Sequence, residues 1–199
     1  NFEKGEFSAI VGPSGCGKTT LLNLIGGLET PNSGEVIIDN SIITKLNSRA
    51  LIDFRLRNIG FVFQAYNLIP VLTAKENVEF IMHLQNYTKT QRNERVEELL
   101  LAVGLKDKLN KRPSELSGGE QQRVAVARAL ASKPKFILAD EPTANLDSKS
   151  TSALLDIMET LNEKENMTFI FSTHDSRVME RARRLISLDD GKVVNDETK

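Results

Sequence analysis

The chain has 199 residues and a formal net charge of −1, with 26 Lys and Arg residues against 27 Asp and Glu residues. This length suits one domain with a sizeable core, and the balanced charge gives no overall attraction to nucleic acid or to an anionic membrane. The single cysteine, Cys16, excludes an internal disulfide. No apolar run approaches the roughly 18 residues that a membrane span needs, so another polypeptide must supply any span.

The first half of the chain alternates strands and helices. Phe7–Val11 is a short apolar run that ends in a glycine-rich turn, which indicates a buried parallel strand. The chain starts at Asn1 without an initiator Met, so we expect the natural N-terminus to lie further upstream. The next predicted elements are a helix over 19–28, a turn over 31–34, and strands over 35–39 and 59–63.

A helical pattern then interrupts this alternation. Apolar residues recur at three- and four-residue steps within 73–103, and Gly104 is the expected stop. Because strand–helix–strand material brackets this stretch, the sequence predicts an α/β fold with a helical insert. The remaining predicted elements are helices over 120–132 and 150–161, strands over 136–139 and 168–172, and a hairpin joining 185–188 to 192–194.

Residues 12–19 fit the phosphate-binding pattern G-x-x-x-x-G-K-[ST] at every fixed position. Glycines let backbone amides surround a phosphate, and the following helix adds its positive N-terminal end. Lys18 is expected to reach the β- and γ-phosphates, and the Thr19 hydroxyl is expected to bind Mg²⁺. A chance glycine-rich turn is disfavoured, because a strand precedes the loop and a helix follows it. The predicted nucleotide-binding residues of this loop are Gly12, Pro13, Ser14, Gly15, Cys16, Gly17, Lys18, Thr19 and Thr20.

Two carboxylates follow the apolar run Phe136–Ala139. A buried strand would place Asp140 at its carboxyl end, where open α/β sheets bind ligands. Asp140 is expected to hold Mg²⁺, and Glu141 to polarise the attacking water. A solvated strand end would explain an isolated Asp-Glu pair equally well, but the upstream phosphate loop favours the functional interpretation.

A second anion site is indicated by Leu116–Glu120, which opens the helix over 120–132. Ser117 and Glu120 have capping-box spacing, and the two glycines between them leave backbone N–H groups uncovered at a helix N-terminus. Taken alone, this pentapeptide is best explained as an ordinary helix cap.

Six motifs follow one another in a fixed order: the phosphate loop, Gln64, Leu116–Glu120, Asp140-Glu141, Asn145–Asp147 and His174. Their order and spacing resemble the ATP-binding cassette (ABC) ATPases over nearly the whole chain. Segments 59–70 and 116–123 resemble in particular the macrolide-exporter and lipoprotein-release type, which also includes antimicrobial-peptide exporters and is close to the cell-division type.

The resemblance implies one nucleotide-binding domain over 1–199. It implies a P-loop NTPase (RecA-like) core with a parallel sheet over 1–64 and 120–199, a helical subdomain insert over 65–119 and a partial antiparallel β edge.

The resemblance also implies residue roles. Gln64 would sense Mg²⁺ and the attacking water, and His174 would contact the γ-phosphate. Ser117 and Gly119 would contact the γ-phosphate that the opposite subunit binds, and Asp147 would cross the dimer interface. Gly118 and Asp147 are also among the implied nucleotide-binding residues. The implied catalytic residues are Glu141, His174, Gln64 and Lys18, and the implied metal ligands are Thr19, Gln64 and Asp140.

Two departures from the family pattern matter. Glu120 stands where the family often has Gln, so we assign it no phosphate contact. Family members also carry strands and an adenine-stacking aromatic residue well before the phosphate loop, and here Phe2 is too close to Gly12 to fill that role. The adenine contact is therefore unassigned.

The expected protein is an ATP- and Mg²⁺-dependent ATPase that forms a head-to-tail homodimer and drives a separate transmembrane permease. It would lie in the cytoplasm on the inner face of the cell membrane and would export peptides, lipoproteins or drugs. No nucleic acid is expected as a partner. An alternative is a cell-division-type ATPase that regulates a membrane partner without transport. A GTPase is disfavoured because no Asn-Lys-x-Asp element occurs, and a chromosome-maintenance or DNA-repair ATPase because its two motifs would lie much further apart. A tandem ABC translation factor is disfavoured because it would carry two cassettes, and this sequence contains one.

Overall fold

A six-stranded sheet with the order β4-β5-β6-β1-β7-β8 forms the centre of the computed structural model, which describes residues 1–199. Neighbouring strands run parallel except β7 and β8, which are antiparallel. The predicted α/β class with a partial antiparallel edge is therefore confirmed. The strands are β1 (Phe7–Val11), β2 (Ile37–Ile38), β3 (Ser41–Ile42), β4 (Ile59–Val62), β5 (Phe136–Asp140), β6 (Thr168–Thr173), β7 (Arg184–Asp189) and β8 (Lys192–Thr198), of which β2 and β3 form a separate hairpin.

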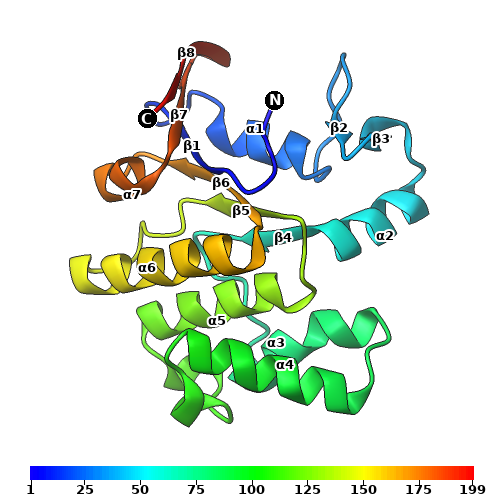
Figure 1. Cartoon of the computed structure of the whole chain (residues 1–199), viewed down its shortest axis with the longest axis vertical. Coiled ribbons are helices and arrows are strands. Elements are labelled where there is room, and N and C mark those ends of the chain that lie inside the picture. The colour runs from blue at the N-terminus through cyan, green and yellow to red at the C-terminus, as the bar shows by residue number, and fades with distance from the viewer.

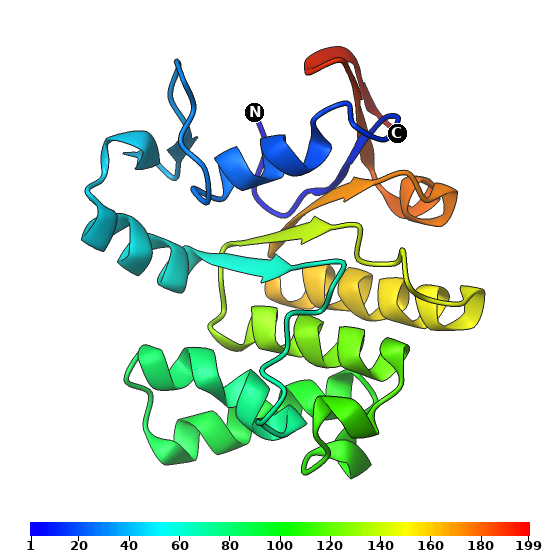
Figure 2. The same ribbon diagram turned by 180° about the vertical axis from the view of Figure 1, so that it is seen from behind.

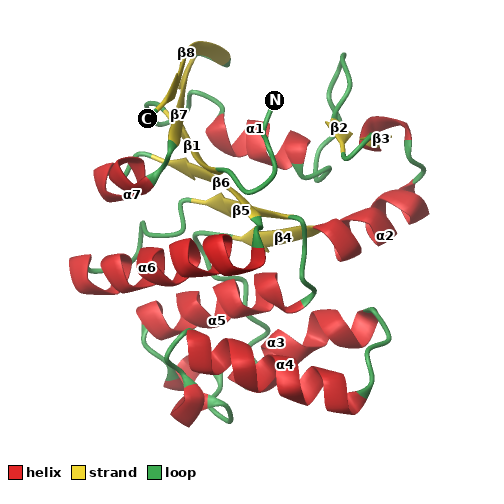
Figure 3. Cartoon of the chain, viewed as in Figure 1, coloured by secondary structure: helices red, strands yellow, loops and turns green.

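Helices cover both faces of this sheet. Helix α1 lies on one face, while α5 and α6 lie on the other, and α3 and α4 pack beyond α5, away from the strands (Figures 1 and 2). The secondary-structure colouring shows this helical layer as a block without strands (Figure 3). The α-helices are α1 (Lys18–Ile25), α2 (Ser48–Asn58), α3 (Ala74–Leu84), α4 (Lys89–Ala102), α5 (Gly118–Ala131), α6 (Ser148–Glu165) and α7 (Ser176–Arg181), and the 3₁₀ turns are η1 (Ile43–Lys45), η2 (Lys106–Lys108) and η3 (Pro113–Glu115).

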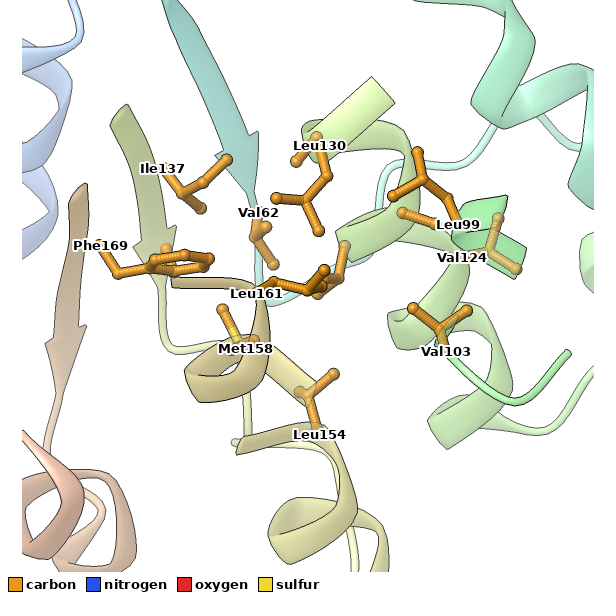
Figure 4. Close-up of a cluster of buried hydrophobic side chains, with 14 of the residues drawn as sticks. Val62, Leu99, Val103, Val124, Leu130, Ile137, Leu154, Met158, Leu161 and Phe169 are labelled. Carbon is orange, nitrogen blue, oxygen red and sulfur yellow. The ribbon is translucent and has the colours of Figure 1, made fainter. Parts of the chain in front are cut away.

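The pleat of the strands divides the apolar side chains between two cores. On the α5–α6 side, Val62, Ile137 and Phe169 pack from adjacent strands against Leu130 and Met158 of the helices (Figure 4). Their neighbours in sequence point to the α1 side, because successive side chains of a strand alternate between faces. Coverage on both faces explains why these strands are continuously apolar.

Several elements differ from the prediction. The helical stretch 73–103 is two helices, because Thr88 and Gln91 form a capping box that starts α4. Helix α1 ends at Ile25, before the expected position, because Gly27 takes a left-handed φ of 62°. Helices α2 and α7 were not predicted. The strand expected over 35–39 is reduced to the two residues of β2.

A helical insert is present where the sequence predicted one, because α3 and α4 lie between β4 and α5 in the chain. Its division from the core at residues 65–119 stays a prediction. None of the helices is both long enough and apolar enough to cross a membrane.

Candidate active site

The loop between β1 and α1 has the conformation that a phosphate cradle needs. Gly12 and Gly17 have φ angles of 153° and 101°, and α1 starts directly after Gly17. A Cβ atom on Gly12 would lie 2.1 Å from the carbonyl oxygen of Leu188, so no other residue fits there. The Lys18 ammonium turns back under the loop and donates to the carbonyl oxygens of Gly12 and Pro13 at 2.8 and 2.9 Å. The cation is thereby held at the centre of the loop.

A polar cleft of about 560 Å³ opens in front of this loop. It collects side chains from the carboxyl ends of four strands, because β1, β4, β5 and β6 are parallel and end at the same edge of the sheet. The lining residues are Ser14, Gly15, Gly17, Lys18, Thr19, Thr20, Gln64, Glu141 and His174.

Most of the expected catalytic and phosphate-binding residues therefore meet in one place. Gly12, Pro13 and Asp140 are not among its lining residues, although Asp140 accepts from the lining residue Thr19. The Cys16 side chain does not line the cleft, because its thiol is buried in the core cluster on the α1 side of the sheet, where it accepts from the Lys18 ammonium at 3.9 Å.

Thr19 and Asp140 are joined although 121 residues separate them. The Thr19 hydroxyl donates to both carboxylate oxygens of Asp140, at 3.0 Å each. A hydroxyl, a carboxylate and the nearby Gln64 amide are hard oxygen donors of the kind that Mg²⁺ accepts. No group of three His, Cys, Asp or Glu side chains is placed to hold a metal alone, and Mg²⁺ usually needs only one or two carboxylates in addition to phosphates.

Glu141 occupies an unusual backbone conformation at the end of β5. Its φ of 45° is left-handed, which costs a non-glycine residue roughly 1–3 kcal/mol and is commonest at functional sites. Its backbone N–H donates to Ser172 O at 2.9 Å, which fixes the turn on β6. One carboxylate oxygen lies 2.7 Å from Nδ1 of His174, and the other accepts from the Thr173 hydroxyl at 3.4 Å. The carboxylate and the imidazole are thus paired inside the cleft.

Ser117 begins α5 with a complete capping box. The Glu120 N–H donates to Ser117 Oγ at 3.3 Å, and the Ser117 N–H donates to the Glu120 carboxylate at 2.8 Å. The pKa of Glu120 is lowered mainly by that N–H, with a smaller contribution from Lys108. Glu at the fifth motif position therefore completes the cap and keeps its charge. The capping box that the sequence predicted is confirmed.

The two glycines after Ser117 are packed closely. A Cβ atom on Gly118 would lie 2.9 Å from the Tyr66 hydroxyl oxygen, and one on Gly119 would lie 3.0 Å from Ser150 Oγ. Ser150 in turn donates to the Asp147 carboxylate at 2.6 Å, and this bond is the largest cause of the lowered pKa of Asp147.

Ser117, Gly118, Gly119 and Asp147 therefore belong to one surface, formed by the N-terminal ends of α5 and α6. None of the four lines the cleft that contains Lys18. The sequence-predicted site residues fall into two separate sets within one chain.

Three polar residues near the cleft were missed by the sequence interpretation: Thr143, Thr173 and Asp175. Thr143 and Asp175 are hydrogen-bonded to each other, and Thr173 contacts Glu141. The available signal was that polar residues follow within a few positions of the two predicted strands at 136–139 and 168–172. Parallel strands that end at one edge bring such residues together.

This site has the features of a P-loop nucleoside triphosphatase. They are a strand followed by a glycine-rich loop, a buried lysine at the start of the next helix, and carboxylates at the end of a neighbouring strand. Comparison with known proteins narrows this class. A sequence model of the ABC transporter family matches residues 1–144. The chain therefore belongs to the ABC transporter family, as an ATP-binding and ATP-hydrolysing subunit.

Relatives support this assignment along the whole chain. An ABC transporter ATP-binding protein of Methanocaldococcus jannaschii is 50% identical over 192 residues, which is 96% of this chain and 85% of that protein. The macrolide export ATP-binding/permease protein MacB of Campylobacter jejuni is 46% identical over 199 residues, covering 100% of this chain and 31% of that longer protein. The resemblance to the macrolide-exporter type is confirmed.

A solved structure has the same fold. It is a dimeric ATP-binding cassette bound to ADP and inorganic phosphate in a post-hydrolysis state. It matches this chain with a TM-score of 0.92 and 45% identity, covering 100% of this chain and 87% of that one. ATP as the nucleotide and ATPase as the activity, both expected from the sequence, are confirmed.

Proposed function

We propose that two copies of this chain bind two ATP molecules between them, head to tail, and drive a membrane permease. The observation that carries this proposal is the separation of the Ser117–Gly119 surface from the Lys18 cleft within one chain. Uncovered amides at the N-terminus of α5 attract an anion, yet the phosphate loop of the same chain lies elsewhere. A second copy brings the two half-sites together, and the similar solved cassette is a dimer.

In this arrangement Lys18 and the loop amides bind the β- and γ-phosphates of ATP. Thr19, Asp140 and Gln64 would hold Mg²⁺, which neutralises phosphate charge when it is bound. Ser117 and Gly119 of the second copy donate to the γ-phosphate, and Asp147 contacts the opposite chain. Because ATP binds both surfaces, it stabilises the closed dimer over the open one.

Glu141 is the general base of the proposed hydrolysis. Its carboxylate faces the cleft and accepts a proton from the attacking water. His174, paired with that carboxylate at 2.7 Å, contacts the γ-phosphate and holds Glu141 in register with it. Cleavage removes the group that bridges the two surfaces, so the dimer opens.

The opening motion is passed to the permease through the segment after Gln64. A groove of about 320 Å³ lies between α3, β4 and this segment, with Phe61, Phe63 and Phe80 among its apolar lining. Arg128 of α5 donates to the carbonyl oxygens of Tyr66 and Asn67, which ties the groove to the helix that Ser117 caps. An apolar helix end of a permease fits such a groove.

We infer that the transported substrates are peptides, lipoproteins or drugs, and that the complex lies on the inner face of the cell membrane. Support comes from the relative whose printed description is a macrolide export ATP-binding/permease protein. No nucleic acid partner is part of the proposal, in keeping with the formal net charge of −1.

Replacing Glu141 by glutamine tests the proposal. Glu141→Gln keeps the shape of the side chain and removes the base, so we expect unchanged ATP binding, loss of phosphate release and an ATP-dependent dimer in light scattering. The matched control, Glu163→Gln, changes an exposed glutamate on α6 and should behave as the wild type. A Glu141→Gln protein that hydrolyses ATP at the wild-type rate contradicts the assignment.

A further inference from the structure

A closed ring of hydrogen bonds lies behind the Glu141–His174 pair. The Thr143 hydroxyl donates to Asp175 Oδ2 at 2.8 Å, and the Asp175 N–H donates to the Thr173 hydroxyl at 3.0 Å. The Thr173 hydroxyl then donates to Glu141 Oε2 at 3.4 Å. The backbone from Glu141 through Pro142 to Thr143 completes the ring. In the sequence, His174 lies between the other two members, Thr173 and Asp175. The ring therefore joins the turn after β5 to the turn after β6.

The two threonines of this ring are shielded from water. Thr143 is 1% exposed and Thr173 is 0% exposed, whereas His174 projects into the cleft with a side chain that is 70% exposed. A buried hydroxyl has no water to replace a lost partner. If the hydrogen bond from Thr143 to Asp175 is lost, water therefore cannot replace it.

Asp175 is itself held firmly by Arg177. The Arg177 guanidinium donates to both carboxylate oxygens, at 2.9 and 2.7 Å, and its backbone N–H donates to Oδ1 at 2.9 Å. Arg177 lowers the pKa of Asp175 to about 2, so the carboxylate stays ionised and accepts from Thr143 at neutral pH. The charge of Asp147 makes a smaller contribution to the raised pKa of Arg177, whose main cause is the hydrogen bond to Asp175.

We propose that Thr143 and Asp175 are positioning residues for ATP hydrolysis, because together they hold the strained Glu141 turn against the His174 segment. Neither residue lines the cleft, and we assign neither a contact with the nucleotide. Their effect is on the placement of the Glu141 carboxylate relative to the attacking water. The inference rests on the proposed roles of Glu141 and His174.

The backbone at Glu141 depends on its surroundings for its conformation. Glu141 has a left-handed φ of 45°, and such a conformation persists only where surrounding contacts determine it. Without the Thr143 hydroxyl, the turn keeps the Glu141 backbone bond to Ser172 and the contacts of the Glu141 side chain with Thr173 and His174, but it loses the hydrogen bond that ties residue 143 to Asp175. A displacement of about 1 Å in a catalytic group can lower a rate by about a hundredfold. ATP binding, which depends on the loop at 12–19, should not change.

Thr143→Val is the direct test, because it removes the hydroxyl and keeps the volume. We expect kcat for ATP hydrolysis to fall about tenfold or more, with KM for ATP and the thermal midpoint close to the wild-type values. Thr143→Ser restores the hydroxyl and should restore kcat. Thr151→Val is the matched control, since Thr151 is equally buried but its hydroxyl has no hydrogen-bond partner.

A second variant covers the case in which Thr143→Val folds poorly. Asp175→Asn keeps the size of the side chain and weakens its hold on Arg177, and we expect it to lower kcat without raising KM. Wild-type kcat in both variants overturns the inference, as does a fall in kcat that Thr143→Ser does not reverse. Glu141→Gln is measured in parallel. If it is inactive while Thr143→Val is fully active, only the positioning role fails, whereas an active Glu141→Gln overturns the proposed site and the inference together.

Discussion

Removing the Ser117 hydroxyl separates its structural role from its proposed role in binding. In the isolated chain, Ser117 caps α5 by accepting from the Glu120 N–H at 3.3 Å. Two other helices begin with the same capping box, at Thr73 with a bond of 3.3 Å and at Thr88 with a bond of 3.4 Å. Substitution of any of these three residues by alanine should therefore cost about 1 kcal/mol of stability, or roughly 2–4 °C in the thermal midpoint of a chain of this size.

The three variants should differ only when ATP is present. If Ser117 also donates to the γ-phosphate on the opposite copy, Ser117→Ala loses a hydrogen bond to a charged group, which contributes about 1.5–3 kcal/mol. That loss corresponds to a roughly ten- to hundredfold fall in turnover at a subsaturating protein concentration. Thr73→Ala and Thr88→Ala should keep the wild-type rate, because neither residue belongs to the shared site.

The assay combines thermal unfolding without nucleotide and phosphate release with ATP and Mg²⁺ on all three variants. The expected pattern is three similar losses in midpoint and one loss in rate. Equal rates in the three variants would refute the reasoning, since Ser117 would then be an ordinary helix cap.

Three further predictions concern stability and pH. Gly60→Ala should cost about 1–3 kcal/mol, because its Cβ atom would lie 2.4 Å from the carbonyl oxygen of Ala129; urea unfolding measures this. Arg95→Met should cost about 3 kcal/mol, because the buried guanidinium binds two glutamates and a backbone carbonyl, whereas Lys111→Met, at an exposed pair, should cost less than about 1 kcal/mol. The stability difference between wild type and Asp175→Asn should be full above pH 4 and should shrink as pH falls toward 2, because the folded pKa is lowered to about 2 from 3.8.

Each of these has a clear contrary result. A neutral Gly60→Ala would show that β4 shifts freely against α5. Equal costs for Arg95→Met and Lys111→Met would show that burial adds nothing to the Arg95 contacts. A stability difference that stays constant down to pH 2 would show that the Asp175 carboxylate is not stabilised in the folded chain.

The parts of the site that the sequence predicted are those encoded by contiguous residues. The loop at 12–19 and the pair Asp140-Glu141 carry their chemistry and their strand context within a few positions. Their convergence was predictable because parallel strands end at one edge of a sheet. The hydrogen bond between Thr143 and Asp175 spans 32 residues and depends on side-chain directions that no local pattern encodes.

The missed helices have local causes. Helix α2 buries none of its residues, so its apolar pattern is weak, although Asn47 caps it. The break between α3 and α4 was predictable from Thr88 and Gln91, which have capping-box spacing. Apolar periodicity continues across this break and conceals it.

The central claim is that each active site contains parts of two chains, and mixing two inactive variants tests it most directly. Lys18→Met damages the phosphate loop, and Ser117→Arg blocks the surface at the N-terminus of α5 with a bulky side chain. Each variant alone should therefore form no intact site. In a mixed dimer, the intact loop of one copy faces the intact surface of the other. We predict that an equimolar mixture recovers up to about a quarter of the wild-type ATPase rate, because half of the dimers are mixed and each has one intact site of two. A mixture as inactive as its components, under conditions where mixed dimers form, would contradict the shared site.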